Sequence, residues 1–76
     1  MQELIEYLVR ELVDDPDGVR IEPVEDDGYT VYQVHVAPAD LGKVIGRRGR
    51  IANALRVVAK AAGLRNRARA SVEIIS

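Results

Sequence analysis

The chain has 76 residues, of which 47% are hydrophobic and 30% are charged, which predicts one small globular domain spanning residues 1–76. It has no cysteine and a single histidine, His35, which excludes disulfides and thiolate metal sites and leaves little for zinc binding or general-base catalysis. No run of about 18 apolar residues is present, and the acidic start lacks the cationic region of a secretory signal, so we expect a cytoplasmic protein without a membrane span.

The net charge of −1 conceals a division along the chain. Residues 1–41 carry eleven acidic and two basic side chains, whereas residues 42–76 carry nine basic and one acidic. Because salt screens charges over about 8 Å under physiological conditions, acidic residues at one end do not fully neutralise a basic face at the other. The pattern therefore permits an anionic ligand, and ion pairs between the two halves are the alternative explanation.

Apolar residues recur at helical spacing near the N-terminus and predict an amphipathic helix. The apolar positions are Leu4, Ile5, Leu8, Val9, Leu12 and Val13. Pro16 and Gly18 end this helix, because proline cannot continue it and glycine lets the chain turn. The aspartates of residues 14–17 lack the alternating ligands and the distant glutamate of a calcium-binding loop, so they predict a solvated turn.

Two strands follow. Residues 19–25 predict the first, and Pro23 points to an edge position because it cannot donate a ladder hydrogen bond. Residues 26–28 predict a hairpin turn before a second strand over residues 29–36. His35 falls on its open face with no partner nearby in sequence, so we expect it to be solvated. The expected helix-facing positions are Val19, Ile21, Thr30, Tyr32, Val34 and Val36, and the open-face positions of the second strand are Tyr29, Val31, Gln33 and His35.

Two helices and a last strand complete the chain. Pro38 suits the first turn of a short helix, and Asp40 favours the positive end of that helix. After an interruption at residues 46–49, a second helix ends near Gly63, with Ile51, Leu55, Val58, Ala59 and Ala62 as its buried stripe. Alternation over residues 67–74 predicts the last strand. The order helix, strand, strand, helix, helix, strand predicts an α+β fold, with three strands covered on one face by helices.

The residues suited to binding chemistry concentrate at positions 42–50. Glycine lets a phosphate approach the main chain, a following helix directs free N–H groups toward it, and arginine adds forked donors. A Walker loop requires Lys-Ser or Lys-Thr after its last glycine, but Arg47 and Arg48 follow Gly46. A dinucleotide loop requires glycine where Val44 stands. It also requires an acidic residue about 20 positions further on, and this chain has none there. Both nucleotide-binding motifs are therefore excluded.

The segment Val44, Ile45, Gly46, Arg47, Arg48, Gly49, Arg50, Ile51 resembles the signature of a KH domain. The order of elements is similar to the type II arrangement, and the resemblance spans essentially the whole chain. A lone unit of this length is similar to the small bacterial RNA-binding proteins of the KhpA family. The resemblance implies single-stranded RNA in a groove between the glycine loop, its flanking helices and the sheet, with the loop clamping about four nucleotides. It implies no catalysis, no cofactor and no metal.

Carried over to this chain, the resemblance implies that the loop residues 46–49 form the clamp, Ile45 offers an apolar edge to the bases, and basic residues supply charge. The expected RNA-binding residues are Lys43, Ile45, Gly46, Arg47, Arg48, Gly49, Arg50, Asn53 and Arg56. Ala52 departs from the larger aliphatic residue of many KH domains. Without phenylalanine or tryptophan, base stacking is limited, which favours low sequence specificity and a role as an RNA chaperone or post-transcriptional regulator.

Other interpretations remain open. Lys60, Arg65, Arg67 and Arg69 are either solvated or in contact with RNA. An adaptor would act mainly through a partner, and the resemblance implies a homodimer or a pair with a larger KH-containing protein of the Jag type, linked to control of cell elongation. The open sheet face with Tyr29, Val31 and His35, or the first helix, would supply that contact. A ribosome-associated assembly factor is the third interpretation, and a small core also favours a dimer.

Overall fold

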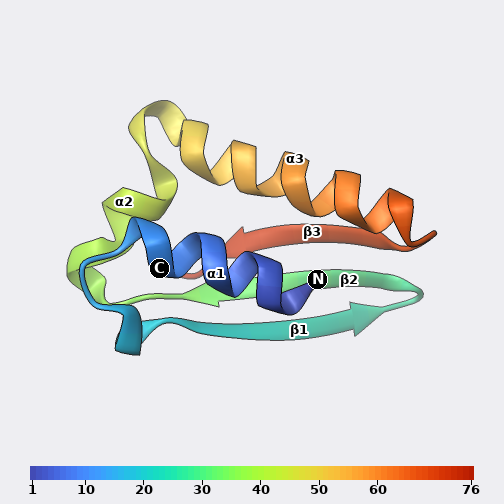
Figure 1. Ribbon diagram of the computed structural model, residues 1–76, viewed down its shortest axis with the longest axis horizontal. Helices are drawn as coiled ribbons and strands as arrows, with labels where there is room; N and C mark the ends of the chain where they lie inside the picture. Colours follow the sequence, from blue (N-terminus) through green and yellow to red (C-terminus); the bar gives the residue numbers. More distant parts are fainter.

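The computed structural model describes residues 1–76 as a three-stranded sheet with helices packed on one face (Figure 1). The helices and strands are α1 (Gln2–Leu12), β1 (Arg20–Asp26), β2 (Tyr29–His35), α2 (Leu41–Ile45), α3 (Arg50–Arg65) and β3 (Arg69–Ile74). Single 3₁₀ turns η1 (Pro16–Gly18), η2 (Pro38–Asp40) and η3 (Arg47–Gly49) lie before β1, α2 and α3. The predicted α+β fold and its order of elements are confirmed.

The sheet has the strand order β1-β2-β3. β1 and β2 are antiparallel, and the turn between them holds Asp27 and Gly28 at positive φ, as a two-residue hairpin turn requires. Because β2 and β3 run parallel, the connection between them must cross over, and α2 and α3 form that crossover. Pro23 lies on β1, an edge strand, as predicted.

The core lies between the sheet and the helices. Its ten buried side chains are Ile5, Val9, Val13, Val19, Ile21, Val34, Val44, Leu55, Ala59 and Val72. Ile5 and Val9 sit four residues apart on α1 and face the sheet, while Leu8 and Leu12 are half-buried at its side. Leu4, which the sequence pattern placed in the apolar stripe, is exposed. The buried face of α1 is therefore narrower than predicted.

The sequence prediction for α3 needs two corrections. The helix does not end near Gly63 but continues to Arg65, and Gly63 is buried within it. A Cβ atom on Gly63 would lie 3.0 Å from the carbonyl oxygen of Ala68, so this glycine allows the helix to approach the start of β3 closely. The buried face holds Ala52, Leu55, Ala59 and Gly63, whereas Val58 is 37% exposed.

No helix covers the other face of the sheet (Figure 1). The expectation that His35 is solvated on this face is wrong. Its side chain is only 26% exposed, and its Nε2 atom lies 3.7 Å from Glu22 Oε2 on the neighbouring strand and makes no hydrogen bond. Strand pairing supplies this neighbour, which local sequence could not indicate.

No helix in the structure is long and apolar enough to span a membrane.

Candidate nucleic-acid interface

The glycine loop, Gly46–Gly49, connects α2 to α3 at the top of Figure 1. Gly46 has φ 75° and ψ 173°, and its N–H donates to the carbonyl oxygen of Gly42 at 2.9 Å. A Cβ atom at Gly46 would lie 2.7 Å from Cγ1 of Ile51, so glycine is required there by both conformation and space. The loop therefore turns sharply, with its main chain close to the first turn of α3.

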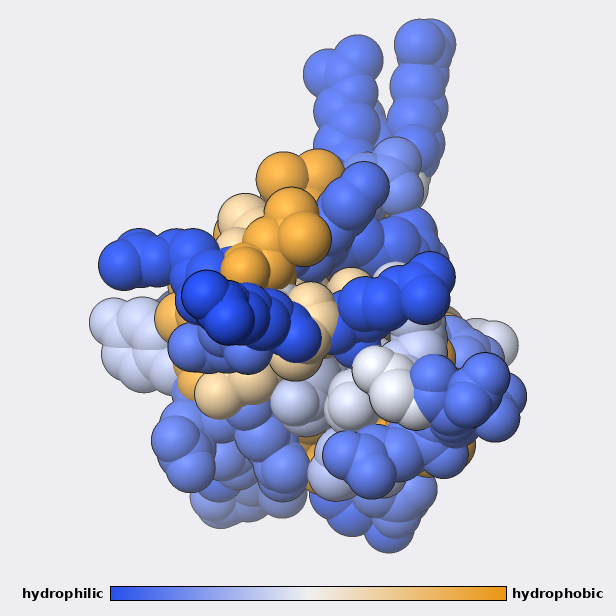
Figure 2. Space-filling view, turned by 90° about the vertical axis from the view of Figure 1, so that its right-hand side faces the viewer, coloured by the Kyte–Doolittle hydropathy of each residue, from blue (hydrophilic) through white to orange (hydrophobic).

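The second half of the loop is left-handed and open. Arg48 has φ 55° and Gly49 has φ 72°, and a Cβ atom at Gly49 would meet nothing within 4 Å. Arg47 and Arg48 are exposed, and Figure 2 shows long hydrophilic side chains projecting from the top of the molecule, at the height of this loop in Figure 1. No side chain caps α3, and the N–H of its first residue, Arg50, donates to the carbonyl oxygen of Arg47, so the start of α3 offers an anion the positive end of the helix dipole rather than the N–H of Arg50.

The carboxylate of Asp40 organises the junction before the loop. Asp40 is 2% exposed, and its two oxygens accept hydrogen bonds from the backbone N–H groups of Asp14 at 3.1 Å and Asp15 at 3.0 Å. We expected Asp40 to act at the positive end of α2, but its side chain does not cap that helix and instead reaches back to the end of α1. The position of α2, and with it the loop, is therefore linked to α1.

Lys43 is part of the same junction. Its Nζ atom lies 3.0 Å from Oδ2 of Asp14 and 3.5 Å from Oδ1 of Asp40. The hydrogen bond to Asp14 and the charge of that carboxylate raise the pKa of Lys43. The hydrogen bond from the Asp14 N–H lowers the pKa of Asp40, against the opposing effect of burial. Lys43 lies near the loop as expected, but two carboxylates already bind it.

Arg56 and Asn53 occupy the side of α3 that faces β3. The Nε of Arg56 donates to the carbonyl oxygen of Val72 at 3.1 Å, and its Nη1 donates to Oδ1 of Asn53 at 2.8 Å. β3 is an edge strand, so one side of its main chain has no strand partner. Arg56 thus joins α3 to this free edge and keeps further N–H donors available.

The remaining expected site residues divide between two sides of α3. Ile45 is half-buried at the end of α2, directly before the loop. Arg50 borders an apolar groove between α1 and α3, rather than the β3 side where Arg56 lies. The structure therefore brings Asn53 and Arg56 into direct contact, whereas Arg50 lies at the edge of this groove. Ala52, the departure noted in the sequence, is buried.

The basic half of the chain is almost free of ion pairs. Among its nine basic residues only Lys43 lies within 4.0 Å of a carboxylate, and the other ion pairs join residues of the acidic half. Ion pairing between the halves therefore does not account for the division of charge. Eight cations remain available to an anionic ligand: Arg47, Arg48, Arg50, Arg56, Lys60, Arg65, Arg67 and Arg69.

Sequence reasoning placed Asp40 at the start of the short helix but missed its contact with the end of α1, because its hydrogen-bond partners lie 25 and 26 residues away and leave no local signal. It also missed the surroundings of Lys60 and Arg69, which line one pocket together with Tyr29. Arg69 lies over the ring of Tyr29, with its Cζ atom 5.5 Å from the ring centroid. The parallel pairing of Tyr29 with Arg69 creates this contact between residues forty positions apart.

Residues 2–74 match the family described as KhpA/KhpB, KH domain. The chain is 45% identical over 75 residues to the RNA-binding protein KhpA of Clostridium acetobutylicum, covering 99% of this chain and all of the relative. It is 44% identical to the protein of the same name from Caldanaerobacter subterraneus, with the same coverage, and 41% identical to that of Borreliella burgdorferi, over 96% of this chain and 89% of the relative. No solved structure matches significantly. The family is not one of enzymes. With this match over nearly its whole length, the chain belongs to the KhpA/KhpB family of KH domains.

Proposed function

We propose that this protein binds single-stranded RNA without catalysis, with the phosphate backbone at the glycine loop and the bases along the side of α3 that faces β3. The observation that carries the proposal is the set of eight basic residues, from Arg47 in the glycine loop to Arg69, that form no ion pair. The relatives named RNA-binding protein KhpA support it. Cations without a carboxylate partner keep their full charge for phosphate, which dominates affinity for nucleic acids.

The loop supplies open space as well as charge. The open side of Gly49 leaves room for a phosphate, and the positive end of the dipole of α3 lies directly beyond it. Arg47 and Arg48 flank this space with exposed side chains. Such a site recognises the backbone, which every RNA shares, so its affinity depends little on sequence.

The bases meet few groups that could distinguish them. Tyr7 lies on α1, Tyr32 packs against the core and Tyr29 lies at the far end of β2, so no aromatic ring adjoins the loop. Ile45 offers only aliphatic surface. We therefore propose low sequence specificity, consistent with an RNA chaperone or a post-transcriptional regulator.

The experiment that tests this proposal uses Gly49. Aspartate and asparagine both tolerate the left-handed conformation, and a side chain there meets open space, so both variants should fold. Gly49→Asp places a negative charge where a phosphate should bind and should abolish binding of labelled oligo-uridine in fluorescence anisotropy. Gly49→Asn is the uncharged control and should weaken binding only partly. A folded Gly49→Asp protein that binds like wild type would show that the loop is not the RNA site.

A second function, self-association or pairing with a larger KH-containing protein, is favoured by the apolar groove between α1 and α3. This groove has a volume of about 380 Å³ and is lined by Leu8, Glu11, Leu12, Arg50, Ile51, Ala54, Leu55 and Val58. Burying its aliphatic side chains in a dimer would compensate for the small core. Light scattering at micromolar concentration should report twice the 8.4 kDa mass of one chain, and Ala54→Glu should restore the monomer. A wild-type protein that is monomeric throughout that range would exclude the dimer.

A further inference from the structure

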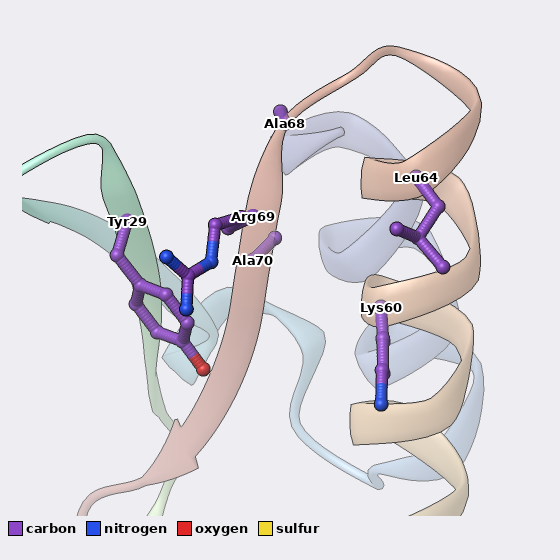
Figure 3. Close-up of a pocket in the computed structure, with 6 residues that line it drawn as sticks. All are labelled: Tyr29, Lys60, Leu64, Ala68, Arg69 and Ala70. Carbon is purple, nitrogen blue, oxygen red and sulfur yellow. The ribbon is translucent and has the colours of Figure 1, made fainter.

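A second pocket lies at the opposite end of α3 from the glycine loop. It has a volume of about 330 Å³ and is lined by Tyr29, Lys60, Leu64, Ala68, Arg69 and Ala70 (Figure 3). Lys60 and Leu64 come from the last turns of α3, and the other residues come from the start of β2 and β3. In Figure 3, Lys60 and Leu64 extend from α3 on one side of β3, and Tyr29 and Arg69 lie on the other.

The chemistry of the pocket fits a nucleotide. Lys60 and Arg69 form no ion pair, so both are available to a phosphate. The guanidinium group of Arg69 lies over the ring of Tyr29, 5.5 Å from the ring centroid, and a guanidinium plane is a surface on which a base stacks. Leu64 is 66% exposed and lines the pocket from the α3 side. Charge, a planar group and an apolar side chain thus converge on one cavity.

One face of α3 connects this pocket with the glycine loop. At helical spacing, it carries Asn53, Arg56, Val57, Lys60 and Leu64. Val57, like Leu64, is 66% exposed, so both expose apolar surface that the fold does not use (Figure 2 shows hydrophobic atoms among hydrophilic ones at this end). The stretch from Arg50 to Lys60 spans about 15 Å at about 1.5 Å per residue, which places the pocket well beyond the loop.

The free edge of β3 borders the same path. The carbonyl of Val72 points to this edge, where it accepts the hydrogen bond from Arg56. Main-chain groups alternate sides along a strand, so Ala70, two residues earlier, directs its main-chain groups to the same side, but it is only 8% exposed and packs beneath Gly63 of α3. The Arg56 end of this edge, and not Ala70, is therefore the part open to a strand of RNA.

We propose that this pocket is a subsite for one further nucleotide of an RNA strand that leaves the glycine loop along α3. The base stacks on the guanidinium group of Arg69, which Tyr29 supports, while Leu64 and Lys60 meet the same nucleotide from the α3 side of β3, Leu64 at the sugar and Lys60 at the phosphate. The inference rests on the proposed RNA-binding function and extends it, because contacts with α3 and β3 then set how many nucleotides of the strand the protein binds.

The test compares labelled oligo-uridine of four and eight nucleotides by fluorescence anisotropy. A footprint of about four nucleotides fits an octamer in several registers, which alone raises affinity about fivefold. Stacking of one more base contributes at least about another fivefold, so we expect wild type to bind the octamer about 25-fold or more tightly than the tetramer. Leu64→Glu should reduce this gain to about fivefold while leaving tetramer affinity within about twofold of wild type.

The matched control is Tyr7→Glu, which adds the same charge at a 61% exposed position on α1 and should keep the full gain. A second variant, Lys60→Gln, should flatten the dependence of log affinity on log salt by about 0.7 for the octamer and leave the tetramer unchanged. If the length gain and the octamer slope survive in both α3 variants, the subsite does not exist, even though Gly49→Asp abolishes tetramer binding. If wild type binds neither oligonucleotide, the proposed RNA-binding function itself is wrong.

Discussion

The Nζ atom of Lys43 lies 3.0 Å from Oδ2 of Asp14, across the junction between the end of α1 and the helix that precedes the glycine loop. Asp40 lies on the other side of the same amine and also binds the backbone of Asp14 and Asp15. An acidic turn from the N-terminal half of the chain thus neutralises the first lysine of the basic half. Lys43 is therefore not free to bind an anion, whereas the eight basic residues after it in the sequence form no ion pair.

Release of Lys43 should strengthen RNA binding. In Asp14→Asn the lysine loses its closest carboxylate, and exposed ion pairs are weak, so we expect affinity for oligo-uridine to rise up to about fivefold. Asp17→Asn is the control, because it removes an equal charge from an exposed residue of the same turn that forms no ion pair. Equal gains in the two variants would attribute the effect to general charge rather than to Lys43.

Replacement of Asp40 should make the stability of the fold depend less on pH in the acidic range. The backbone hydrogen bond from Asp14 lowers the pKa of Asp40 below its ordinary value of 3.8, so the carboxylate form stabilises the fold. That contribution is complete above the unfolded pKa and is lost as pH falls through the lower folded pKa. In thermal melts, Asp40→Asn should lower Tm most near neutral pH, and the difference from wild type should shrink below about pH 4. A difference that stays constant with pH would contradict this role.

Two glycine-to-alanine substitutions should change stability in opposite directions. A Cβ atom at Gly42 meets open space at an ordinary helical conformation, so Gly42→Ala should stabilise the protein by about 0.5–1 kcal/mol. At Gly63 the same atom would meet the carbonyl of Ala68, and overpacking costs about 1–3 kcal/mol, which outweighs the gain in helix propensity. Urea unfolding measures both values. A Gly63→Ala protein as stable as Gly42→Ala would mean that β3 can move away from α3.

The salt dependence of binding should locate the phosphate contacts. If about four phosphates of a 5′-phosphorylated tetranucleotide are neutralised, log affinity should fall with log salt at a slope of about −2.8, which is about −0.7 for each contact. Replacing Arg47 and Arg48 together by glutamine should reduce this slope to about −1.4, because each lost contact removes about 0.7.

Arg10→Gln combined with Arg20→Gln removes the same charge from α1 and β1 and serves as the control for the salt experiment. This pair should leave the slope unchanged, because both arginines lie near carboxylates on elements away from the loop. Should the control flatten the slope as much as the loop variant does, the loop arginines make no direct phosphate contact.

The sequence by itself predicted which elements form and where the glycine loop stands between them. Hydrophobic spacing of two or about 3.6 residues reports the apolar face of a strand or helix, Pro23 restricts the backbone locally, and Gly46 permits the positive φ of the loop. These signals depend only on residues within a few positions of one another. They correctly indicated the helix order, the edge strand, the hairpin turn and the break before α3.

Only the tertiary structure decided which distant groups meet. Asp40 binds the main chain at the end of α1, His35 lies beside Glu22, and Gly63 allows α3 to approach Ala68. The face of α3 that is buried also depends on where the sheet lies, which is why Val58 is exposed and Ala52 is buried. A periodic pattern specifies that a face is apolar, but not what will pack against it, because that partner is chosen by strand order and crossover geometry rather than by neighbouring residues.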